Sequence, residues 1–105
     1  MALDADALLS TMSQAAANAF GQVWKDVKNY TIPELRKLAG TFVDIELGLS
    51  AKPPYYTKES ADILFRMQVR AAQSILTATT ALTMMQVEKA LNRSSPPSAW
   101  RSTRP

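Results

Sequence analysis

Two adjacent prolines near the middle of the chain, Pro53 and Pro54, set the strongest limit on what this sequence can fold into. A proline has no N–H and pushes the residue before it towards extended geometry, so no helix can continue through this pair. Residues 50–57 are therefore predicted to form a loop. On both sides of the loop, apolar residues recur every three or four positions, which is the period of an amphipathic helix. The sequence thus predicts an all-α protein, either a helical hairpin or a three-helix bundle.

Three helices are predicted, over residues 4–29, 32–47 and 58–92. Asp4 and Thr57 are residue types that commonly cap helix N-termini. Thr31 and Glu34 have the T-x-x-E spacing of a capping box, with Pro33 in the first turn. The third helix is much the longest, about 52 Å at the usual rise. The expected architecture is a single helical domain, residues 1–92, with one long C-terminal helix.

The apolar residues of the second and third predicted helices define a packing seam. Along the second helix the steps alternate between three and four residues, as in helices that pack on one another. The predicted seam consists of Leu35, Leu38, Phe42, Ile45, Leu49, Leu64, Ile75 and Leu82. An intramolecular core is the expected role of this seam, and an oligomer interface is the alternative.

Two long stretches without charge, residues 7–24 and 71–87, favour helices that face other helices. Both contain several serine, threonine and glutamine side chains, which argues against a membrane span. The second stretch is apolar over more than half of its circumference, so the first helix or another subunit is expected to cover it. Four methionines also sit at helical spacing; these are Met12, Met67, Met84 and Met85. Core filling is expected of them, with an adaptable partner-binding surface as the alternative.

The net charge of +3 arises entirely in the last 13 residues. Nine basic side chains balance nine acidic ones up to residue 92, whereas Arg93, Arg101 and Arg104 have no acidic neighbour. Residues 93–105 contain three prolines, and their apolar residues show no helical periodicity, so an irregular basic tail is predicted. Three arginines are too few for a nucleic-acid footprint, and nucleic acid is not an expected partner. The candidate partner-contact residues are Tyr55, Tyr56, Trp100, Arg101 and Arg104.

The chain contains neither cysteine nor histidine. Disulfides, thiolate catalysis and Ser-His-Asp or Cys-His sites are therefore excluded, and the usual zinc ligands are missing. The three glycines stand apart from one another, so there is no glycine-rich phosphate loop. We expect no enzymatic activity, no cofactor and no metal. Asp4 and Asp6 occupy the place of a positive signal-peptide start, so the cytoplasm or an assembled particle is the expected location.

The segment Glu59–Asn92 combines a short acidic turn, an I-L-x-x-M-Q stretch and a helix of small apolar residues. In these features it resembles small helical proteins encoded in phage and bacterial genomes. The resemblance implies a phage or prophage particle component and no particular activity. In those proteins a further amphipathic helix follows, whereas here the helical pattern ends at Arg93.

The expected function is therefore that of a non-enzymatic structural or assembly protein. It would act through self-association or by docking into a larger complex, with other copies of itself or other helical proteins as partners. One alternative is a membrane-surface or holin-like protein that uses the two uncharged stretches. Another is a small regulatory binding module that contacts its partner through the C-terminal tail.

Overall fold

The computed structural model describes residues 4–80 and 82–96, and this part of the chain contains helices and no strand. Its elements in chain order are α1 (Ala5–Phe20), the short 3₁₀ helix η1 (Gly21–Val23), α2 (Trp24–Ser50), α3 (Lys58–Thr79) and α4 (Met84–Ser94). The prediction of an all-α protein is confirmed. The molecule is compact, with dimensions of 44 × 25 × 23 Å.

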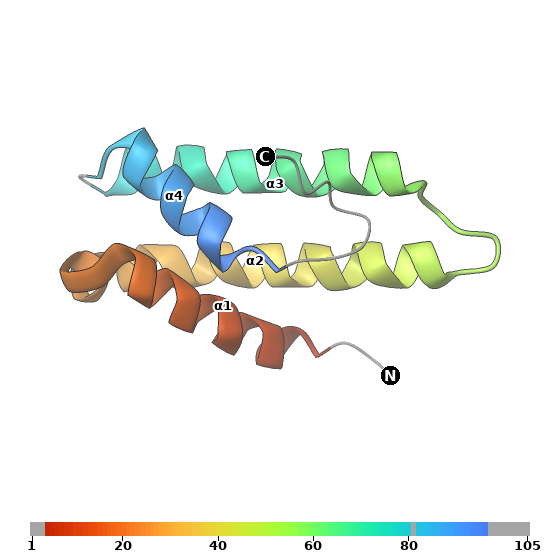
Figure 1. Ribbon diagram of the computed structural model, residues 1–105, viewed down its shortest axis with the longest axis horizontal. Coiled ribbons are helices and arrows are strands. Elements are labelled where there is room, and N and C mark those ends of the chain that lie inside the picture. The colour runs from red at the N-terminus through yellow and green to blue at the C-terminus, as the bar shows by residue number, and fades with distance from the viewer. Residues whose placement is uncertain (1–3, 81, 97–105) are drawn as a thin grey trace.

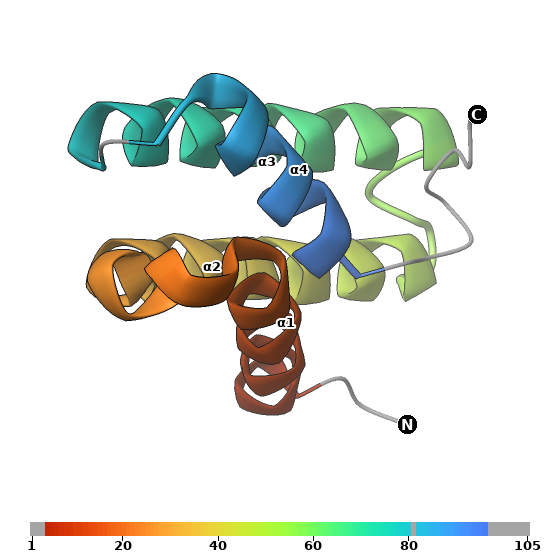
Figure 2. The same ribbon diagram turned by 60° about the vertical axis from the view of Figure 1, so that its left-hand side comes forward.

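An antiparallel hairpin of α2 and α3 forms the base of the fold (Figure 1). The two helices lie side by side and are joined by the proline-containing loop, residues 51–57. α1 packs along α2, and α4 runs obliquely from α3 towards α1 (Figure 2). α1 contacts α2, α2 contacts α3, α3 contacts α4 and α4 contacts α1, so the four helices close into a ring.

The core lies inside this ring and draws on all four helices. Phe42 of α2 and Phe65 of α3 meet edge to face, with ring centroids 5.8 Å apart and an interplanar angle of 78°. Around this pair lie fully buried residues from the other two helices, namely Met12 and Ala16 of α1 and Val87 and Leu91 of α4. Each large side chain buried in this way contributes about 1.5–3 kcal/mol relative to leaving it in water.

Two of the predicted helix starts are confirmed by hydrogen bonds. The Asp4 carboxylate accepts from the Asp6 N–H at 3.0 Å and caps α1. At the start of α3, the Thr57 hydroxyl accepts from the Ser60 N–H, and the Ser60 hydroxyl accepts from the Thr57 N–H, each at 3.0 Å. This reciprocal capping box fixes the point at which the loop after Pro54 becomes a helix.

The predicted boundary between the first two helices is wrong. α1 ends at Phe20, and α2 then runs from Trp24 to Ser50 without a break near residue 30. The chain turns at Gly21, whose φ of 64° and ψ of −130° lie in a region that side-chain-bearing residues rarely adopt. Phe20 and Trp24 stack across the turn, with ring centroids 6.1 Å apart. Gly21 therefore terminates a helix that the sequence pattern alone continues to residue 29.

The predicted capping box at Thr31 does not form, because this residue lies inside α2. The buried Thr31 hydroxyl donates to the Val27 carbonyl one turn earlier, at 2.9 Å. Glu34 instead pairs with Lys37, at 3.3 Å. Thr31 and Glu34, the two residues of the expected capping box, therefore both lie in the middle of a continuous helix and interact with other residues of that helix.

The predicted long C-terminal helix is also wrong, since the longest described helix is α2, with 27 residues. The segment expected to be one helix divides into α3 and α4, with Thr80 in extended geometry between them. The Thr83 hydroxyl accepts from the Gln86 N–H at 3.2 Å, and the Gln86 side-chain oxygen accepts from the Thr83 N–H at 2.9 Å. This second capping box starts α4, which folds back onto α3 and α1 and covers part of the apolar surface predicted for one long helix.

Gly21→Ala tests the turn between α1 and α2. No atom lies near the position of a new methyl group at Gly21, so its effect comes from the backbone alone. Forcing alanine into this geometry is expected to lower the free energy of unfolding by about 1–3 kcal/mol in urea denaturation. Gly40→Ala is the matched control, because Gly40 lies inside α2 and is equally open. Alanine there is expected to stabilise the protein by up to about 1 kcal/mol. Equal changes in the free energy of unfolding in both variants would contradict the turn geometry described for Gly21.

Pro33→Ala tests whether α2 is continuous. Pro33 is exposed, and its missing N–H leaves the Asn29 carbonyl without a helical donor on the solvent side. Proline in a helix interior costs about 3 kcal/mol relative to alanine, offset by up to about 1 kcal/mol of unfolded-state entropy. We expect this substitution to raise the free energy of unfolding by about 1–2 kcal/mol. A neutral or destabilising result would show instead that a helix starts at Thr31.

Candidate functional site

The candidate site is the face of the α2–α3 hairpin that α1 and α4 leave uncovered. In α3 the buried residues gather on one side of the helix, and these are Ala61, Phe65, Val69, Ala72, Gln73 and Leu76. The side turned away from them carries an apolar row at steps of three, four, four and three, which we call the α3 outer face. It consists of Leu64, Met67, Ala71, Ile75 and Ala78.

Four of the five residues of the α3 outer face are exposed, and only Leu64 is half-buried against the core. Met67 has 58% of its surface exposed and Ile75 has 40%. None of the five is charged; the nearest charged residue of α3, Arg70, is offset from the row by about a quarter-turn. The face therefore presents about 21 Å of uncharged helix surface to solvent.

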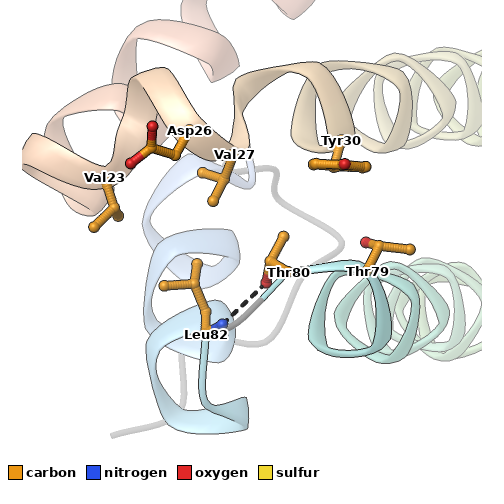
Figure 3. A pocket seen from close by; sticks show the side chains of 7 residues that line it. All are labelled: Val23, Asp26, Val27, Tyr30, Thr79, Thr80 and Leu82. Atoms are coloured by element: carbon orange, nitrogen blue, oxygen red, sulfur yellow. Dashed lines mark hydrogen bonds between the residues drawn. The ribbon is translucent and has the colours of Figure 1, made fainter.

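A groove between α2 and α3 runs beside the α3 outer face. Its larger cavity, of about 260 Å³, lies where α2 begins and α3 ends (Figure 3). Val27 and Tyr30 of α2 face Thr80, the residue after the end of α3, across this space, and the Thr80 hydroxyl accepts from the Leu82 N–H at 3.2 Å. The Asp26 carboxylate lies at the edge of the cavity, turned away from the space between the helices (Figure 3).

A smaller cavity of about 120 Å³ continues the groove towards the middle of the hairpin. Its lining residues are Glu34, Lys37, Leu38, Gln68, Ala71, Ala72 and Ile75. From one cavity to the other, the lining residues of α2 continue at steps of three and four, and so do those of α3. Residues at this spacing share one side of a helix. Both cavities therefore lie along the same side of α2 and the same side of α3. Because Ala71 and Ile75 also belong to the α3 outer face, the groove and the face form one continuous surface.

The α3 outer face is uncharged, and the groove beside it combines apolar and polar side chains. Its one ion pair joins Glu34 to Lys37 within α2, at 3.3 Å. Even the larger cavity falls below the 300–1,000 Å³ usual for small-molecule sites, and it is open to solvent. Within residues 4–80 and 82–96, no group of three acidic, histidine or cysteine side chains is placed to hold a metal ion. The surface can accept apolar side chains from another helix.

The structure places the predicted seam residues in two environments. Those on α2 lie in the core: Leu35, Leu38, Phe42 and Ile45 are buried, and Leu49 packs against them. Leu64 and Leu82 are half-buried against the same core. Ile75, by contrast, lies on the exposed α3 outer face. The seam therefore includes residues of both the core and the open surface.

The methionine prediction holds for one residue of the four. Met12 is buried in the core, whereas Met67, Met84 and Met85 are exposed. Core filling was expected for all of them, and only Met67 belongs to the α3 outer face. Ala71 and Ala78 of the α3 outer face are not among the predicted seam or contact residues. Their helical spacing from Met67 and Ile75 is the sequence signal that places all four on one face.

The two tyrosines predicted as partner contacts have different environments. Tyr55 is 77% exposed, whereas Tyr56 is half-buried and its ring packs over Gly48 in the last turns of α2. The Tyr55 N–H donates to the Gly48 carbonyl at 2.9 Å, which ties the loop to the end of α2. The other predicted contacts, Trp100, Arg101 and Arg104, lie outside the described residues.

Comparison of the chain with models of known protein families, with curated proteins and with solved structures finds no match. Among the described helices, none is long and apolar enough to cross a membrane.

The tyrosine pair provides a test of the loop. Tyr56→Ala removes a ring that packs against the core and over Gly48, so it is expected to lower the free energy of unfolding by about 1–2 kcal/mol. Tyr55→Ala is the matched control and should change it by no more than about 0.5 kcal/mol. Urea denaturation of both variants measures the difference, and equal losses would contradict the different roles of the two rings.

Proposed function

We propose that this protein is a non-enzymatic structural or assembly protein that packs the α3 outer face against helices of other subunits. The observation that carries this proposal is the charge-free row of exposed apolar residues on α3, centred on Ala71 and flanked by Met67 and Ile75. α1 and α4 pack on the other side of the hairpin, so among the described helices only α2 lies beside this row, across the groove.

The burial of apolar surface supplies the driving force for such packing. Burial of exposed apolar surface contributes about 25 cal/mol of favourable free energy per Å² removed from water. When the helix face is uncharged, this contribution is not reduced by the cost of burying an unpaired charge. Grouped apolar residues on one face, unlike scattered single ones, are typical of a protein interaction site. The groove beside the face offers space for side chains from an opposing helix.

Two features of the sequence support this class of function. The absence of cysteine and histidine removes the residues on which most catalytic and zinc sites depend. The resemblance of Glu59–Asn92 to small helical proteins of phage and bacterial genomes supports a phage or prophage particle as the setting of the assembly.

Met67→Glu tests the proposed role of the α3 outer face. At several hundred micromolar, the wild-type protein is expected to have a mass above 11.5 kDa in size-exclusion chromatography with light scattering. A carboxylate buried in the contact should raise the dissociation constant at least about tenfold. We therefore expect a shift towards the monomer with no loss of helix content by circular dichroism.

Met85→Glu is the matched control, because Met85 is 77% exposed and lies on α4, away from the α3 outer face. It should associate like the wild type. A wild-type protein that remains monomeric at this concentration contradicts self-association. Equal losses in both variants would show that the α3 outer face is not the contact.

A further inference from the structure

We infer that two copies of this protein exchange their α4 helices. Residues 80–83 of each copy become helical and join α3 and α4 into one straight helix, and α4 of each copy then takes the place of α4 in the other. This contact is separate from the α3 outer face, because α4 packs on the opposite side of the hairpin. The turn between α3 and α4 is the basis of the inference.

The turn between α3 and α4 differs from the turns that flank α2. The turn after α1 contains Gly21 at a φ of 64°, and the loop after α2 contains two adjacent prolines. Residues 80–83 contain neither glycine nor proline. Thr80 and Thr83 have φ values of −115° and −75°, in the extended region that residues of any type share with the helical one. No special backbone conformation at these two threonines therefore prevents a helix.

Side-chain hydrogen bonds hold this turn instead. The Thr80 hydroxyl donates to the Leu76 carbonyl at 2.7 Å and accepts from the Leu82 N–H at 3.2 Å. The reciprocal bonds of Thr83 and Gln86 then start α4. In a continuous helix, the N–H groups of these residues would bond to carbonyls four residues earlier. They therefore keep hydrogen-bond partners when the turn opens.

The buried residues of α3 and α4 fall on one side of the helix when the turn is helical. Leu76, the last buried residue of α3, and Val87, the first of α4, are eleven residues apart. Eleven residues make three helical turns to within about 20°. The buried row of α3 therefore continues through Val87 and Leu91 of α4, and the straight helix has a single apolar side for the core.

A second copy of the chain is the partner that completes the straight form. In a single open molecule, Val87 and Leu91 would leave the core, and Met12 and Ala16 of α1 would lose the helix packed on them. α4 of a second copy carries the same residues, so it restores the contacts with α1 and α3 in each half of the dimer. Only the joint at residues 80–83 then differs between monomer and dimer, and such exchange is a low-cost route to a dimer.

Met84→Pro tests the exchange in the full-length protein. Met84 is the first residue of α4, and the ψ of 159° at Thr83 suits the residue before a proline. Proline is tolerated at a first helical position, so the monomer keeps its turn. In the straight helix the same proline would lie in the interior, where it removes a hydrogen bond and clashes with the preceding turn. Met84→Ala is the matched control, because it removes the same side chain and favours a helix.

Each protein is unfolded in urea and refolded at several hundred micromolar, and the dimer is measured by size-exclusion chromatography with light scattering. The wild type and Met84→Ala are expected to form a dimer of twice 11.5 kDa. Met84→Pro should raise the dissociation constant at least about a hundredfold, because both straight helices carry the proline. Thr83→Ala removes the hydroxyl that caps α4, so it should lower this constant several-fold. This opposite change tests the exchange even if Met84→Pro fails to fold.

Equal dissociation constants for Met84→Pro and Met84→Ala would overturn the exchange. A wild type and a Thr83→Ala variant that both remain monomeric after refolding would overturn it as well. Met67→Glu separates this inference from the proposed contact through the α3 outer face. A dimer that is lost in Met67→Glu and kept in Met84→Pro supports the α3 outer face and contradicts the exchange, whereas the reverse result supports the exchange.

Discussion

The contact between α2 and α3 is the interaction on which the remainder of the structure depends. Phe42 and Phe65 meet edge to face at its centre, and the buried residues of both helices extend from this pair along the hairpin. α1 and α4 are shorter, and their apolar residues are buried only because the hairpin gives them a surface to cover. Since short helices are marginal alone in water, tertiary packing of this kind decides whether they form.

Local signals in this sequence state where a helix can begin, and tertiary packing decides whether it does. Thr31-x-x-Glu34 and Thr83-x-x-Gln86 have the same spacing, yet only the second forms a capping box. Val27, one turn before Thr31, is buried against the fold, so continuing the helix keeps apolar contact. The all-α class, the central loop and the caps at Asp4 and Thr57 were predictable because each rests on local chemistry.

The end of α3 shows why the long C-terminal helix was not predictable from periodicity. Three threonines there donate their hydroxyls to carbonyls one turn back: Thr77 to Gln73, Thr79 to Ile75 and Thr80 to Leu76, at 2.7–2.8 Å. Threonine bonds of this kind compete with the regular helix ladder and tend to bend it. The apolar period continues past this point, so the period alone gave no sign of the break.

The candidate site was predictable only in part, for a similar reason. On α2 the apolar residues form one narrow row, so the sequence identifies the side of this helix that is buried. The row consists of Leu35, Leu38, Phe42 and Ile45. α3 is apolar around more of its circumference, so the sequence does not say which of its rows the hairpin covers. The pattern therefore predicts a core position for Ile75 and Met67, whereas the fold leaves both in solvent.

The closed ring of helices links the two ends of the described chain. α1 and α4 lie far apart in sequence, yet each is the other's neighbour and both cover the same side of the hairpin. Local opening of one would expose apolar surface of the other, so the two are expected to behave as one cooperative unit. Their amide protons would then exchange with solvent at similar rates, and a disturbance at either end of the chain would be felt at the opposite end.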